Sequence, residues 1–171
     1  MRIETAVLSS GSKGNSTYIR AGKYSVLIDA GLSGKGLEER MAALDLDPAE
    51  LDALLITHEH KDHIKGVGIL SRRYDLPIYA NDGTWGGAES DLGKIDPKNR
   101  RVFTGDFMIG DLNFSPYSIS HDASQPVGYV CQAGSKKIVL ATDTGVMNEE
   151  IIKKIKGADF FVLESNHDLE M

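Results

Sequence analysis

Short apolar runs bounded by polar residues occupy three segments near the N-terminus, residues 3–10, 16–21 and 24–31. These segments are rich in β-branched and aromatic residues, and turns that contain glycine separate them. This composition between turns predicts three short β-strands. Between the first two strands, residues 9–16 are polar and rich in glycine, which predicts a loop.

Two later segments have the spacing of helices. Residues 34–44 and 63–74 place apolar side chains three or four positions apart, which predicts one amphipathic helix in each. Residues 46–57 between them predict a turn that leads into a buried strand, and residues 81–90 predict a loop or a weak helix. The apolar helical positions are Leu37, Met41 and Leu44 in the first helix and Ile64, Val67, Leu70 and Tyr74 in the second.

The rest of the chain has mainly a β pattern. Apolar runs bounded by turn residues predict strands, and the amphipathic residues 148–157 predict one more helix. This order of elements predicts an α/β fold of layered sheets and helices, in a single domain that spans residues 1–171. The predicted strands of this part are residues 76–80, 100–104, 106–120, 126–133, 136–143 and 158–165.

Composition and charge limit the classes of protein to which the chain can belong. Hydrophobic residues make up 41% and charged residues 26%, as in soluble globular proteins. The formal net charge of −6 argues against a broad DNA-binding face but leaves open a phosphate-binding cleft that holds cations. Cys131 is the only cysteine, so no intrachain disulfide forms and a reducing, cytoplasmic location is expected. The N-terminus lacks the pattern of a signal peptide, and no apolar run reaches the ~20 residues of a membrane span.

Four residues that bind metals cluster directly after the apolar residues 51–56. The segment THEHKDHIKG places His58, His60, Asp62 and His63 within six positions, where a strand passes into a helix. Two histidines two positions apart on an extended segment point to the same side. Neutral imidazole and carboxylate bind zinc, manganese or iron, and the lack of thiolate disfavours a closed structural zinc site.

Two further polar residues follow other predicted strands. His121 ends the strand in YSISHDA, and Asp143 ends the strand in IVLATDTG. Taken singly, each is also typical of an ordinary core, surface or turn position. Because functional residues of layered α/β proteins gather at strand ends, we expect both to join the histidine cluster as metal ligands.

The motif HxHxDH after an apolar strand, then a distant histidine and then an aspartate, resembles the metallo-β-lactamase-fold hydrolase superfamily. The resemblance covers nearly the whole chain and implies an αββα sandwich. Within the superfamily, the chain is similar to the bacterial YycJ/WalJ-type branch, which is nuclease-like. The segments that carry this similarity are SSGSKGNSTYI, THEHKDHIKG, SISHDA, ATDTG and LESNHD.

This resemblance implies a site for two divalent metal ions, with zinc as the first choice and manganese or iron as alternatives. Asp29 in LIDAG would orient one ligating histidine through a hydrogen bond, as acidic partners of metal-bound imidazoles do. The implied ligands are His58, His60 and His121 for the first ion, Asp62 and His63 for the second, and Asp143 as the bridge between them.

The chain departs from the family pattern at its C-terminal end. The family completes the second metal site with a histidine well downstream of the bridging aspartate. After Asp143 the sequence offers only His167, four residues before Met171. We therefore expect the second half of the domain to be incomplete. Either the second metal lacks a ligand, or His167, water or another chain supplies it.

The resemblance implies a hydrolase in which a hydroxide shared by the two ions attacks a phosphodiester bond. Asp62 would orient this nucleophile, and His167 or a metal-bound water would protonate the leaving group. Nucleic acid is the expected substrate, cleaved by a DNA exonuclease. The alternatives are a hydrolase of small molecules, such as a lactone, thioester or cyclic phosphodiester, which the net charge favours, and a metal-binding fragment without turnover.

Three further residues are weaker candidates for substrate contacts. Lys13 and the backbone N–H groups of residues 9–16 suit a phosphate, although this loop is more typical of a hairpin connection near the metals. Trp85 and Tyr74 have rings of the kind that stack on bases, but isolated aromatic residues more often belong to the core or its rim. The oligomeric state is left open by the sequence.

Overall fold

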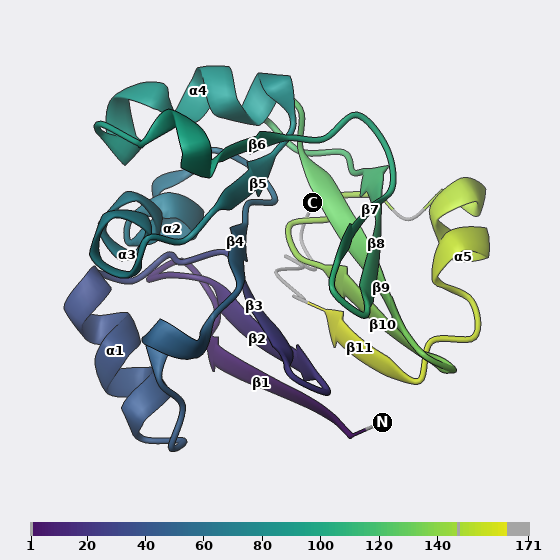
Figure 1. The fold of residues 1–171 in the computed structure, drawn as a ribbon. Helices are drawn as coiled ribbons and strands as arrows, with labels where there is room; N and C mark the ends of the chain where they lie inside the picture. The colour runs from purple at the N-terminus through teal and green to yellow at the C-terminus, as the bar shows by residue number, and fades with distance from the viewer. Residues whose placement is uncertain (1, 147, 164–171) are drawn as a thin grey trace.

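The structure is a computed structural model that describes residues 2–146 and 148–163. Two β-sheets pack face to face, and helices cover the outer face of each (Figure 1). This arrangement confirms the predicted αββα sandwich. The first sheet has the strand order β1-β2-β3-β4-β5-β6, and the second has the order β11-β10-β9-β8-β7.

The elements follow the expected order along the chain. The strands of the first sheet are β1 (Ile3–Ser9), β2 (Ser16–Ala21), β3 (Tyr24–Ile28), β4 (Ala53–Leu55), β5 (Ile78–Ala80) and β6 (Arg100–Val102). Those of the second sheet are β7 (Phe107–Ile109), β8 (Leu112–Ser118), β9 (Val127–Ala133), β10 (Lys136–Ala141) and β11 (Phe160–Leu163). The α-helices are α1 (Gly34–Ala42), α2 (Lys61–Ile64), α3 (Val67–Tyr74), α4 (Asp82–Leu92) and α5 (Glu149–Ile155), and short 3₁₀ turns span Pro48–Glu50 and Pro97–Asn99.

Alternation along the strands builds the hydrophobic layers. Around β4, Leu54 and Ile56 face the layer beneath α1, α3 and α4, whereas Ala53 and Leu55 face the layer between the sheets. A third, smaller layer lies between the second sheet and α5. Because successive side chains of a strand point to opposite faces, a fully apolar strand such as β4 is buried on both sides.

The parallel part of the first sheet positions the site. Strands β3, β4, β5 and β6 run parallel to one another, so their carboxyl ends meet at one edge of the sheet. Asp29 follows β3 at this edge, and the histidine motif follows β4. Ligands in open α/β sheets bind at the carboxyl ends of the strands.

Two predicted elements were wrong in detail. The helix expected at residues 63–74 is divided into α2 and α3, because the Gly66 N–H donates to Ala30 O at 2.7 Å. A Cβ at Gly66 would also lie 2.6 Å from Leu32 O. The strand expected at residues 106–120 is a hairpin of β7 and β8 that turns at Gly110, whose φ is +54°.

Helix α4 is a regular helix where the sequence predicted a loop or a weak helix. Its N-cap Asn81 accepts a hydrogen bond from Thr84 N at 2.8 Å, and Trp85, Ala88 and Leu92 are buried on one face. Packing of this face offsets the poor helix propensity of its glycines. In contrast, Leu44, expected on the buried face of the first helix, lies beyond α1 and is 50% exposed.

We expect Phe114→Ala to lower the free energy of unfolding by about 3–5 kcal/mol, because it removes a large side chain from the layer between the sheets. Phe114 is 0% exposed, stacks on Phe107 with a centroid distance of 5.4 Å and contacts the edge of Tyr129. Urea denaturation followed by circular dichroism measures the change.

The matched control is Met108→Ala on the same hairpin, where the side chain is 65% exposed. This variant should stay within about 0.5 kcal/mol of the wild type. Equal effects of the two substitutions would contradict the assignment of Phe114 to the core.

Candidate metal centre

The histidine motif occupies the turn between β4 and α2. His58 lies in the extended segment that follows β4, and His60 is the N-cap of α2. Asp62 and His63 lie within α2, so the chain changes direction between the two pairs. The local geometry thus allows the motif to place side chains around two neighbouring points.

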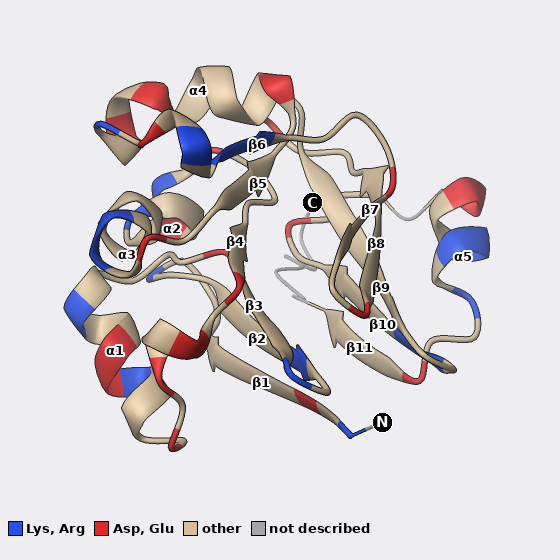
Figure 2. Ribbon diagram, in the orientation of Figure 1, with Lys and Arg blue, Asp and Glu red and all other residues tan. Residues whose placement is uncertain are grey.

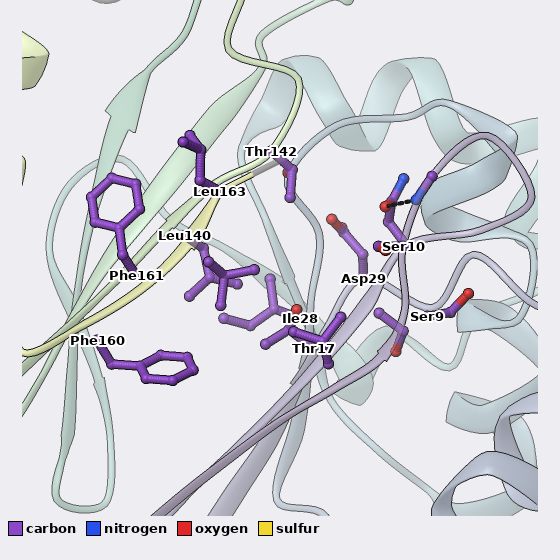
Figure 3. A pocket seen from close by; sticks show the side chains of 15 residues that line it. Ser9, Ser10, Thr17, Ile28, Asp29, Leu140, Thr142, Phe160, Phe161 and Leu163 are labelled. Carbon is purple, nitrogen blue, oxygen red and sulfur yellow. Dashed lines mark hydrogen bonds between the residues drawn. The ribbon is translucent and has the colours of Figure 1, made fainter. Parts of the chain in front are cut away.

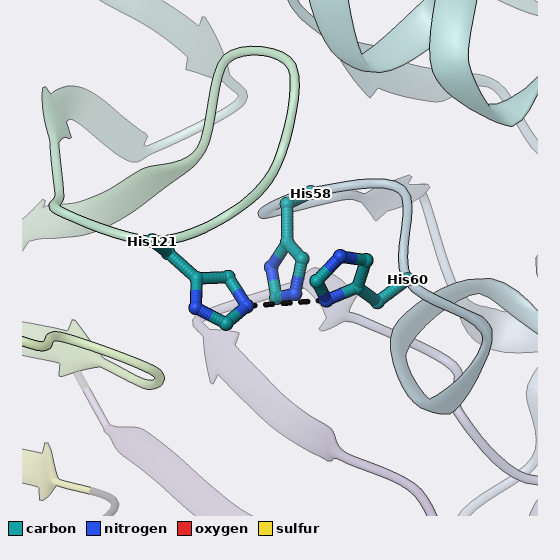
Figure 4. A group of neighbouring side chains, drawn as sticks. All are labelled: His58, His60 and His121. Atoms are coloured by element: carbon teal, nitrogen blue, oxygen red, sulfur yellow. Dashed lines mark hydrogen bonds between the residues drawn. The ribbon is translucent and has the colours of Figure 1, made fainter.

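One group of donors joins the two sheets. The ring nitrogens of His58, His60 and His121 converge with all three ligand atoms within 4.8 Å of one another (Figure 4). His60 Nδ1 and His121 Nε2 are 3.1 Å apart. His121 follows β8 of the second sheet, so residues about sixty positions apart meet here. These three residues are the ligands that the sequence predicts for a first metal ion.

A second group lies beside the first and shares His58 with it. His58, His63 and Asp143 also place their ligand atoms within 4.8 Å of one another. His63 Nε2 lies 2.9 Å from Asp143 Oδ2 and 3.7 Å from Asp62 Oδ2. The structure therefore brings together all six predicted ligands that fall within the described residues. The bridging role of Asp143 remains a prediction.

Contacts behind the rings fix which nitrogen faces the centre. His63 Nδ1 lies 2.8 Å from Asp29 Oδ2, which leaves His63 Nε2 for the centre. His60 Nε2 lies 3.2 Å from Asp122 O, which leaves His60 Nδ1. Metal-binding imidazoles commonly use one nitrogen for the ion and donate the other N–H to such a partner.

His58 provides the clearest test of whether a cation fits. Thr57 Oγ1 donates to Asp29 Oδ2 at 2.7 Å and lies 3.0 Å from His58 Nδ1, which assigns the His58 proton to Nδ1. His58 Nε2 is buried and has no hydrogen-bond partner within the described part of the chain. A buried lone pair without a donor is costly, and a metal ion bound between these imidazoles would satisfy it.

The charges of the centre also suit a cation. Burial and the neighbouring His63 lower the pKa of His58 to about 4, so this imidazole is neutral near pH 7. Burial also acts to lower the pKa of His63, but the carboxylates of Asp29 and Asp143 outweigh it and raise this pKa to about 10. Contact with His63 holds the pKa of Asp143 below its usual value. Positive charge is therefore stabilised between these carboxylates.

Two aspartates of the centre, Asp29 and Asp143, adopt the left-handed region of backbone conformation. Asp29 has a φ of 58° and Asp143 a φ of 52°. This conformation costs energy for residues other than glycine, and aspartate is among those that tolerate it best. Such strain clusters at functional sites, where it aims a side chain that a relaxed turn would direct elsewhere.

Two residues of the centre were missed by the sequence reasoning. Asn15 Nδ2 lies 3.0 Å from His63 Nε2, and Asn15 Oδ1 accepts from Gly11 N at 3.0 Å. Thr57 Oγ1 contacts Asp29 and lies 3.0 Å from His58 Nδ1 and 3.3 Å from His63 Nδ1. The signal for Thr57 was its place directly before the motif. For Asn15, the signal was its place in the polar loop of residues 9–16, which was expected near the metals.

The weaker candidates have different outcomes. Trp85 is 2% exposed and lies beneath the Arg100 guanidinium, so its ring offers no free face for a base. Tyr74 is half-buried against the core and its hydroxyl donates to Glu38, and stacking of a base on its ring remains a prediction. Lys13 is exposed on its loop, where phosphate binding remains a prediction. His167 lies outside the described residues.

A pocket of about 410 Å³ opens beside the centre, between the β1–β2 loop and the strands β10 and β11 (Figure 3). Its lining reaches Asn15 and Asp29 but includes none of the four histidines of the two donor groups. Ser9 and Ser10 make the side of the β1–β2 loop polar, while Phe160, Phe161 and Leu163 make the side of β11 apolar.

Comparison with known proteins agrees with this geometry. The Beta-lactamase superfamily domain matches residues 24–171. The chain belongs to the metallo-β-lactamase superfamily. It is 43% identical over 173 residues to Exodeoxyribonuclease YycJ of Bacillus anthracis, covering 100% of this chain and 66% of the relative. It is 42% identical over 170 residues to Exodeoxyribonuclease WalJ of Streptococcus pneumoniae, covering 97% of this chain and 63% of the relative.

A solved structure shows the same fold. The metallo-β-lactamase fold protein YhfI from Bacillus subtilis superimposes with a TM-score of 0.74 at 18% identity, covering 93% of this chain and 69% of that one. The 171-residue chain spans 63–66% of the length of the two exodeoxyribonucleases. None of the helices in residues 2–146 and 148–163 has the length and apolar character that a membrane crossing requires.

We expect Asp29→Asn to weaken metal binding by about 10–100-fold, as changes to partners of metal-bound histidines commonly do. An amide at this position would donate its N–H to His63 Nδ1, which would move the His63 proton to Nε2 and block that nitrogen as a ligand. Competition with a chromophoric chelator measures the dissociation constant.

Asp52→Asn is the control, because Asp52 Oδ2 accepts from Ser25 N at 2.7 Å at the opposite end of the same strands. It should bind metal like the wild type. Normal metal binding by Asp29→Asn would show that Asp29 does not set the orientation of His63.

Proposed function

We propose that this chain carries the metal centre of a hydrolase that cleaves phosphodiester bonds, acting on DNA as an exonuclease. The observation that carries the proposal is the pair of donor groups that share His58. The identity to two exodeoxyribonucleases across nearly the whole chain supports DNA as the substrate. Because the chain is shorter than these relatives, the activity of the whole protein is part of the proposal.

The proposed ligands are those of the two groups together with Asp62. Imidazole and carboxylate suit zinc best, and manganese or iron would also bind. Divalent ions bound here would lower the pKa of water and neutralise the charge that develops on a phosphodiester. The assigned sets are His58, His60 and His121 for one ion, Asp62 and His63 for the other, and Asp143 between them.

The side chains themselves would position the reactants. The Asp62 side chain is 35% exposed and lies beside His63 Nε2, so its carboxylate can accept a proton from an attacking water on the open side of the centre. Asp143 is less exposed and reaches the same nitrogen from the second sheet. His167 is the proposed proton donor to the leaving group. It lies outside the described residues.

A small-molecule hydrolase is the second candidate, and the distribution of charge favours it. Residues of both signs lie side by side on α1 and α5 (Figure 2), and the formal net charge is −6. A broad basic face would be the usual footprint of a protein that binds DNA along its length. An exonuclease that contacts DNA mainly at the metal centre needs less of such a face.

The cytoplasmic location also remains a prediction. Cys131 is buried as a free thiol, and burial raises its pKa to about 12, which keeps it protonated and unreactive. A protein without disulfides suits a reducing compartment.

We expect Asp62→Ala to abolish the release of nucleotides from end-labelled DNA by the metal-loaded protein, because the water and one ion lose their carboxylate partner. Chelation should also abolish the activity of the wild type, and added zinc or manganese should restore it. Gel analysis of the labelled strand measures the reaction, and circular dichroism checks the fold.

Asp91→Ala is the matched control, since Asp91 pairs with Lys61 of α2 at 3.5 Å on the surface. It should retain activity. Turnover of a lactone or of bis-p-nitrophenyl phosphate without loss of DNA ends would favour the small-molecule hydrolase. A folded, metal-loaded protein that cleaves none of these substrates would favour a fragment without turnover.

A further inference from the structure

The first donor group depends on how a loop of the second sheet is held against the histidine motif. His58 and His60 follow β4, whereas His121 lies in the loop of residues 119–126 between β8 and β9. Three imidazoles bind one ion well only when their spacing is set before the ion arrives. A contact made by residues other than the ligands must therefore hold this loop in position.

Glu59 makes that contact from within the motif. Its Oε1 accepts hydrogen bonds from Ser124 N and from Ser124 Oγ, each at 2.6 Å. Glu59 lies between the two histidines of the motif, and Ser124 lies three residues after His121. One carboxylate thus fastens the loop to the motif beside the ligands without being a ligand itself.

Helix α4 packs against both partners of this contact, Glu59 and the loop that contains Ser124. A Cβ at Gly87 would lie 2.7 Å from Glu59 Cγ, and a Cβ at Gly83 would lie 2.5 Å from Gln125 Cβ. The Gly83 N–H also donates to Gln125 Oε1 at 3.2 Å. The two glycines are four positions apart and so share one face of the helix.

The third glycine of α4 has different surroundings. A Cβ at Gly86 would meet nothing within 4 Å. Alanine there gains helix propensity at no steric cost, so Gly86→Ala separates the effect of the helix from the effect of the contact with the loop.

We propose that Glu59 and the Gly83–Gly87 face of α4 position the loop that carries His121, and thereby set the affinity of the first metal site. These are positioning residues, because they act through His121 and do not touch the ion. The proposal rests on the metal binding in the proposed function and is independent of the substrate.

The test uses Co²⁺ as the probe, because its visible absorption reports the number and geometry of its ligands. Glu59→Ala should weaken the tightest Co²⁺ site by about tenfold or more and change its spectrum. Glu59→Gln should stay close to the wild type, because an amide oxygen still accepts both hydrogen bonds from Ser124. A purely structural role of Glu59 would lower the melting temperature and leave the spectrum unchanged.

The glycines give a second test that does not depend on Glu59 variants folding. Gly83→Ala and Gly87→Ala should each weaken Co²⁺ binding and alter the spectrum, whereas Gly86→Ala should do neither. If Glu59→Ala, or this pair of glycine variants, binds Co²⁺ as the wild type and Gly86→Ala do, the proposal is overturned. If the wild type itself binds no Co²⁺, the proposed function fails instead.

Discussion

The buried carboxylate of Asp29 is the constraint on which the metal centre depends. It accepts from Thr57 N at 2.9 Å and from Thr57 Oγ1 at 2.7 Å, and it contacts His63 Nδ1. A buried carboxylate is costly unless hydrogen bonds satisfy it, and here Thr57 and His63 provide them. The end of β3, the end of β4 and helix α2 are therefore tied at one point. The same point fixes the orientations of His58 and His63.

The second constraint is the packing of the two sheets. His121 and Asp143 reach the centre from the second sheet, so the hydrophobic layer between the sheets sets their distance from the motif. Two hydrogen bonds cross this layer near the centre: Tyr129 donates to Ile56 O at 2.7 Å, and Val127 N donates to Thr57 O at 3.0 Å. Because close-packed interiors deform little, the donors are held in place before any ion binds. The hydrophobic core thereby positions the metal-binding side chains as well as stabilising the fold.

Much of the fold could be predicted from local pattern. Apolar runs bounded by turn residues identified the strands of both sheets, because buried strands are continuously apolar. Helical spacing identified α1 and α5, because burial of one face of a helix imposes that period. The errors in element boundaries and element type lay at glycines. Gly66 divides a helix because its N–H bonds to Ala30 and its Cα faces Leu32, and the glycines of α4 concealed a helix that packing stabilises. In each case a contact distant in sequence outweighed local propensity.

The sequence by itself determined the chemistry of the centre. The spacing of His58, His60, Asp62 and His63 after an apolar strand is a local pattern, and donor types are visible one residue at a time. Only the tertiary structure decided which nitrogen of each ring faces the centre, and that Asn15 and Glu59 contact the groups around it. Such contacts join residues that are distant in the chain, and the sequence around each residue does not predict its partner. They form because the packing of the two sheets and α4 brings these residues together, and that packing is a property of the whole folded chain.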